Sequence, residues 1–340
     1  MLRAASGERS HGVDAFRGLT VIAMIVVHTT RVMPVTAEQR GFRAHASLFE
    51  PAVSVAFLWL VGWSLDRSFG RASHSGTAWG RWYAGALLRA ATLYALGVLL
   101  FTLQYGVVAP DVWASPDVLS TIAWAIVLVG AWLSLGLWGL IGGALAVLAL
   151  TALLETRGVH VSGLNAGPGA TLPLVAVACA GACQGRTGSD RLTSSFLWPA
   201  LAVVLIALAL GLPGKLLDQH SSGQTHIGAL WFWNHTLKGI LVYGGSVVVG
   251  VTAFVRSRLG ARRWALPLRL LGRHALVAYV GHLLVLGSID RWFDPGPGWS
   301  SLVSVALGLV AAFTGIAMVL ESEVGSHARQ GVRRHLGLRI

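Results

Sequence analysis

Three histidines stand where an ionisable side chain is unusual, within or beside long apolar stretches of the sequence. His28 is followed three residues later by Arg31, so a helix would place both on one face. His45 precedes an apolar stretch and is followed by Glu50, while His282 lies inside another such stretch. Imidazole titrates near neutrality, so each histidine can accept a proton as a general base or bond to substrate as a nucleophile. The sequence favours neither route.

The elements that must hold these side chains are membrane helices. A chain of 340 residues that is 54% hydrophobic and 12% charged is too apolar for an ordinary soluble domain. A spanning helix needs about 20 mostly apolar residues. The sequence therefore predicts an all-α integral membrane protein with about ten spans. The predicted spans are 16–34, 48–66, 83–104, 118–134, 136–154, 170–184, 196–213, 231–255, 270–289 and 301–320.

The basic residues orient these spans. Most of the 26 lysines and arginines fall at one side once the N-terminal residues 1–15 are placed in the cytoplasm, and the basic tail 322–340 falls there too. The positive-inside rule then predicts that both termini are cytoplasmic. This distribution explains the net charge of +12 by topology and contact with anionic lipid, so no nucleic-acid partner is expected.

In this orientation the three histidines gather toward the outer leaflet. His28 is near the outer end of the first span, His45 lies just before the second, and His282 is in the outer half of the ninth. Ionisable groups in lipid usually face a bundle interior or a wet cavity. For any single histidine, the alternative to a functional role is a purely structural hydrogen bond. Three on the same side favour a polar centre where the first, second and ninth spans meet.

The cysteines and the aromatic segments give weaker evidence of a functional site. Cys179 and Cys183 are four residues apart in one predicted span, and two sulfurs make a poor metal site, so we expect packing residues and no metal. The outer segments 230–235 and 290–299 are rich in aromatic residues. They fit an interfacial belt, and stacking on a sugar is the alternative.

The first predicted span resembles that of a known family. Residues 13–28 read VDAFRGLTVIAMIVVH, which is similar to the D-x-x-R-G start of the transmembrane acyltransferases typified by heparan-alpha-glucosaminide N-acetyltransferase and its bacterial relatives. Asp14, Arg17, Gly18 and Met24 match that pattern. Further segments resemble the family in the same order: 45–47 (HAS), 60–65 (LVGWSL), 87–100, 117–128 and 270–286. The chain departs from the family at His28, where asparagine is frequent, and at Thr121, where arginine is usual.

The resemblance implies an enzyme that takes an acetyl group from cytoplasmic acetyl-CoA and delivers it across the membrane. The implied acceptor is an amine or hydroxyl of a sugar, a glycan or an aminoglycoside-like compound. His45 matches the family's active-site histidine. Donors in a low-dielectric cavity would stabilise the oxyanion of acyl transfer, and arginine forks suit the phosphates of coenzyme A.

Eleven residues are expected to form the site on this basis. The catalytic candidates are His45, His28 and Glu50. The acceptor-binding candidates are Arg31, Asp117, His282 and Asp290. The candidates for binding acetyl-CoA are Arg17, Arg81, Arg89 and Arg273. Asp14 and Arg17, three residues apart, could instead pair with each other.

The remaining expectations concern organisation. Residues 1–340 show no internal repeat and no linker long enough for a second domain, which predicts a single multi-pass membrane domain. The resemblance implies that this domain is an acyltransferase in a bacterial plasma membrane, with a homodimer as one option for its assembly. A small-molecule transporter without acyl transfer is the alternative function, since buried ionisable residues also occur there. Paired broken helices would favour it.

Overall fold

A computed structural model describes residues 10–33, 39–114, 117–159, 161, 163–165, 170–187, 237–256, 259–292 and 298–322. All regular elements in these ranges are helices. The chain divides into two compact units. One comprises Met1–Arg9 and Ala44–Thr252, and the other comprises Ser10–Arg43 and Ala253–Ile340.

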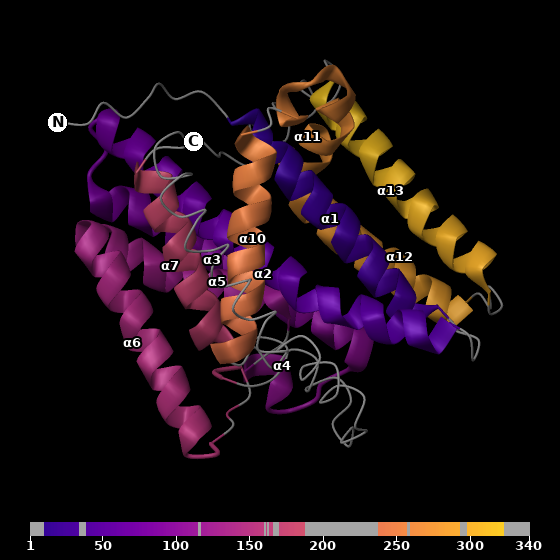
Figure 1. The fold of residues 1–340 in the computed structure, drawn as a ribbon, viewed down its shortest axis with the longest axis horizontal. Coiled ribbons are helices and arrows are strands. Elements are labelled where there is room, and N and C mark those ends of the chain that lie inside the picture. Colours follow the sequence, from indigo (N-terminus) through magenta and orange to yellow (C-terminus); the bar gives the residue numbers. More distant parts are fainter. Residues whose placement is uncertain are drawn as a thin grey trace. The chain divides into compact units, whose positions relative to one another are not determined.

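The first unit is a bundle of apolar helices. Its elements are α2 (Gln39–His74), α3 (Trp79–Tyr105), α4 (Asp111–Ala114), α5 (Val118–Leu133), α6 (Gly136–Thr156), α7 (Thr171–Thr187) and α10 (Leu237–Arg256). The first residues of α2 and the last residues of α10 belong to the second unit. Helix α3 packs on α5, and α6 packs on α7 (Figure 1).

Glycine allows α2 and α7 to approach closely. A Cβ atom added at Gly62 would overlap the carbonyl oxygen of Ala178, and one added at Gly181 would overlap that of Trp59. Small residues at such crossings are typical of membrane helices, which associate mainly through close packing. The two glycines therefore set the distance between α2 and α7.

Large apolar side chains lie on the surface of the first unit. Leu88 and Leu99 on α3 are 67% and 53% exposed, and Trp138 on α6 is 80% exposed. Extended apolar surface of this kind marks a site of contact with a membrane or another protein. On helices as apolar as α3 and α6, it suits contact with lipid tails.

The second unit is built around α1 (His11–Val32). Its other elements are η2 (Leu259–Ala261), η3 (Arg263–Ala265), α11 (Leu266–Arg273), α12 (Ala275–Trp292) and α13 (Trp299–Glu321). Helix α1 packs against α11, α12 and α13 (Figure 1). Ser10 caps its first turn by accepting a hydrogen bond from the Val13 amide. The buried Thr29 hydroxyl donates to the Ile25 carbonyl, so α1 satisfies this polar group internally.

Four described helices are long and apolar enough to cross a membrane, namely α1 (over His11–Thr30), α3, α6 and α13. A fifth span results if the bent pair Arg263–Arg273 and Ala275–Ile289 counts as one. The expected all-α fold with membrane helices is therefore confirmed for the described residues. The count of ten spans and the cytoplasmic termini stay predictions, and the predicted span 196–213 lies outside the described residues.

The predicted ninth span, 270–289, differs from the structure. Helix α11 ends at Arg273, His274 is its C-cap, and the following helix turns by 73°. The reason is the contact between α11 and the first turns of α1. Gly272 lies so close to α1 that an added Cβ atom would overlap the carbonyl oxygen of Asp14. This contact fixes the direction of α11, while α12 packs separately along α1.

Candidate active site

His28 and His282 meet in the second unit, from helices α1 and α12. His28 Nδ1 lies 2.7 Å from His282 Nε2, which is hydrogen-bonding distance. The two rings are nearly parallel, at 13°, with their centroids 5.0 Å apart. Two residues separated by 254 positions in the sequence thus form one polar contact between apolar helices, named here the histidine pair.

His282 is enclosed on all sides. Its side chain is 0% exposed, and its Nδ1 lies 2.9 Å from the Ala278 carbonyl oxygen. The Tyr279 ring meets it edge-on at 5.7 Å. One residue before it, Gly281 leaves room for the Phe313 ring, which an added Cβ atom would overlap. The orientation of the His282 ring is therefore set by hydrogen bonds and packing together.

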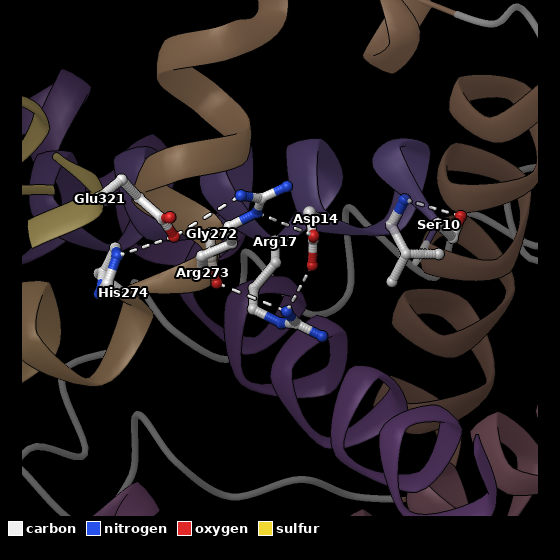
Figure 2. Close-up of polar contacts among 8 residues, drawn as sticks. Ser10, Asp14, Arg17, Gly272, Arg273, His274 and Glu321 are labelled. Atoms are coloured by element: carbon white, nitrogen blue, oxygen red, sulfur yellow. Dashed lines mark hydrogen bonds and ion pairs between the residues drawn. The ribbon is translucent and has the colours of Figure 1, made fainter. Parts of the chain in front are cut away.

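The other end of α1 carries a charged cluster, defined as Asp14, Arg17, Arg273, His274 and Glu321 (Figure 2). Arg17 Nη1 donates to Asp14 Oδ1 at 3.0 Å, and Arg273 Nε lies 3.5 Å from Asp14 Oδ2. Glu321 Oε1 lies 3.6 Å from Arg273 Nη1 and 3.3 Å from His274 Nε2. These contacts join α1, α11 and α13.

The charges of this cluster largely cancel. Two carboxylates face two guanidinium groups, and Asp14 itself is buried. The pairing of Asp14 with Arg17, left open by the sequence, is thus formed. Arg17 and Arg273 already have acidic partners, so their role toward coenzyme A phosphates stays a prediction.

Helix α1 links the histidine pair and the charged cluster. Asp14 and His28 are 14 residues apart, close to four helical turns, so they lie on the same side of α1. At 1.5 Å per residue their backbones are about 21 Å apart along the axis. That is roughly two-thirds of a hydrocarbon core about 30 Å thick.

The other expected ligands of acetyl-CoA belong to the first unit. Arg81 and Arg89 lie on α3, and both are exposed. Arg89 Nε donates to the Gly85 carbonyl oxygen one turn earlier, at 3.2 Å. The exposed Leu88 is its neighbour in the sequence, so Arg89 presents a charge beside an exposed apolar side chain of α3.

Asp117, expected to bind the acceptor, begins helix α5. It is the N-cap, and its Oδ1 accepts from the Val118 amide at 2.6 Å. The Thr121 side chain, one turn further along α5, is fully buried. Asp117 thus has a clear role in helix capping.

The side chains of four expected site residues lie outside the described part of the chain. His45 and Glu50 belong to α2, Arg31 to α1 and Asp290 to α12. Their roles stay predictions.

Sequence reasoning missed a partly buried ion pair in the first unit. Arg186 Nε on α7 lies 3.3 Å from Asp66 Oδ1 on α2, and Asp66 is 7% exposed. The available signal was an aspartate at the end of the predicted span 48–66.

The two cysteines lie on α7. Cys179 is buried, Cys183 is half-buried, and both are unbridged, as packing residues would be.

Comparison of the chain with known proteins identifies its family. No curated protein matches the chain. The family model described as "Heparan-alpha-glucosaminide N-acetyltransferase, catalytic" matches residues 9–216, which include His28 and His45 but not His282 or Arg273. Since this match covers more than half of the chain, the protein belongs to the heparan-alpha-glucosaminide N-acetyltransferase catalytic family.

Proposed function

We propose that this membrane acetyltransferase moves an acetyl group from cytoplasmic acetyl-CoA to an amine or hydroxyl of an extracytoplasmic sugar or glycan. Residues 1–340 would act as one multi-pass domain in a bacterial plasma membrane. Family membership supports acetyl transfer in general. The observation that carries the proposal is the histidine pair, because titratable groups between apolar helices are costly and such groups usually mark a functional site.

In the proposed reaction, the acceptor nitrogen or oxygen attacks the thioester carbonyl carbon. A histidine takes the proton of the attacking group, the carbon–sulfur bond breaks, and coenzyme A leaves as a thiolate that is then protonated. His45 and His28 are the candidates for this base. As the alternative route, His45 first takes the acetyl group on a ring nitrogen and then passes it to the acceptor.

The other expected residues have supporting roles in this proposal. Glu50 would orient His45, and Arg31 would stabilise the oxyanion. Asp117 and Asp290 would bind the acceptor. Arg17, Arg81, Arg89 and Arg273 would hold the phosphates of acetyl-CoA on the cytoplasmic side.

The test uses proteoliposomes with a panel of acceptors enclosed and labelled acetyl-CoA outside. The panel contains glucosamine, oligosaccharides and an aminoglycoside. We expect label on an enclosed acceptor with the parent protein, and a loss of about 10²-fold or more with His45→Ala. His74→Ala is the matched control, because His74 is exposed on the same helix and its Nδ1 lies 2.6 Å from the Gly70 carbonyl oxygen one turn earlier.

Two results would contradict the proposal. If His45→Ala transfers acetyl as fast as the parent, His45 has no role in the reaction. Movement of unmodified acceptor across the bilayer, with no acetylated product, would instead identify a transporter.

A further inference from the structure

The hydrogen bonds of the histidine pair determine where its protons lie. A carbonyl oxygen only accepts hydrogen bonds, so the His282 Nδ1 facing Ala278 carries a proton. A second proton on His282 Nε2 would make the ring a cation that is fully buried between apolar helices. Such a charge is costly without an acidic partner, and the contacts of His282 within the described part of the chain include no carboxylate. His282 is therefore neutral, with its lone pair on Nε2.

This arrangement fixes the tautomer of His28. Because His282 Nε2 accepts, His28 Nδ1 must donate across the 2.7 Å contact. The small angle of 13° between the rings lets this N–H bond lie near the plane of both imidazoles. In a neutral His28 the lone pair then belongs to Nε2, the nitrogen directed away from His282.

We propose that His282 is a positioning residue that holds His28 in this tautomer, so that His28 Nε2 is the atom that takes up a proton during acetyl transfer. The proposal rests on the proposed function. The proton would come from the attacking amine or hydroxyl as the thioester carbon–sulfur bond breaks, and would pass on to the departing thiolate. It changes the expected role of His282 from binding the acceptor to setting the chemistry of His28.

The first measurement needs no turnover. In protein labelled with ¹⁵N-histidine, we expect a protonated Nδ1 and an unprotonated Nε2 for His28, and a scalar coupling between His28 Nδ1 and His282 Nε2. His28→Asn assigns the signals among the 12 histidines. A protonated His28 Nε2 in the neutral ring would overturn the proposal.

The second measurement compares two substitutions. In His282→Gln, the amide oxygen can still accept from His28 Nδ1, whereas His282→Leu removes the acceptor. We expect His282→Leu to lower kcat by about 10- to 100-fold and to leave KM for the acceptor within twofold of the parent, since general bases contribute about 10²- to 10⁴-fold. We expect His282→Gln to retain most of the parent kcat. Leu286→Met is the control, a volume-conserving change at a buried position one turn along α12.

The outcomes separate the two proposals. A rise in KM with unchanged kcat in His282→Leu would show acceptor binding and overturn the positioning role. Equal loss in Gln and Leu, with both folded, would also overturn it. The expected spectrum without any acetyl transfer would contradict the proposed function, and the positioning role with it.

Discussion

Arg273 Nε lies 3.5 Å from Asp14 Oδ2, so the last turn of α11 is tied to the first turn of α1. Asp14 also holds Arg17 at 3.0 Å. One buried carboxylate therefore contacts two guanidinium groups, and the stability of the second unit should depend on it more than on any single arginine.

Asp14→Asn should destabilise the protein by about 1–3 kcal/mol, because both arginines lose their shared acidic partner. Glu321→Gln should cost less, since the Glu321 side chain is 31% exposed. Thermal unfolding in nanodiscs measures both. Equal midpoints for Asp14→Asn and the parent would show that the cluster adds nothing to stability.

Gly272→Ala should separate α11 from α1, because the new methyl group overlaps the Asp14 carbonyl oxygen. Overpacking of this kind costs about 1–3 kcal/mol. Gly142→Ala is the control, since Gly142 in α6 has open space around its Cβ position. A lower unfolding midpoint for Gly272→Ala alone is the expected result, and equal midpoints would contradict it.

Arg89→Gln should weaken the use of acetyl-CoA without affecting stability, because Arg89 is exposed and bonds to its own helix. Charge-assisted hydrogen bonds contribute about 1.5–3 kcal/mol, so KM for acetyl-CoA should rise about tenfold or more. Arg157→Gln, at the exposed C-cap of α6, is the matched control. A larger change in KM for the acceptor than for acetyl-CoA would contradict the assignment.

Asp117→Ala should lower stability by about 1 kcal/mol through the lost N-cap of α5. Asp117→Ser keeps a capping oxygen and removes the charge, so it should unfold like the parent. KM for a cationic acceptor in the Ser variant then measures binding alone. An unchanged KM would contradict a role of Asp117 in binding the acceptor.

The sequence predicted the helices with strong apolar patterns. Predicted spans 83–104 and 301–320 correspond to α3 and α13 within a few residues, because long apolar runs are their own signal. A meeting of the helices that carry His28 and His282 was also expected, from the shared depth of these residues in the membrane. The bend at His274 could not be predicted from composition. No proline marks it, and it arises from the packing of Gly272 on α1.

Pairings between distant residues were harder to predict. The partners Asp66 and Arg186 are 120 residues apart, and Arg273 and Asp14 are 259 apart, so no helical spacing relates them. Only the folded chain selects such partners from many arginines. The roles of His45 and Glu50 rest on the resemblance of the sequence to its family.

The separation of His28 and His282 also sets the timing of biogenesis. The ribosome completes α1 early, yet the 254 residues that lead to its partner take roughly 13–50 s at about 5–20 residues per second. During that interval a newly inserted α1 holds an imidazole in the bilayer without its final acceptor. The histidine pair forms only when α12, one of the last helices, has been inserted. A nascent chain stalled before α12 would therefore contain His28 without His282.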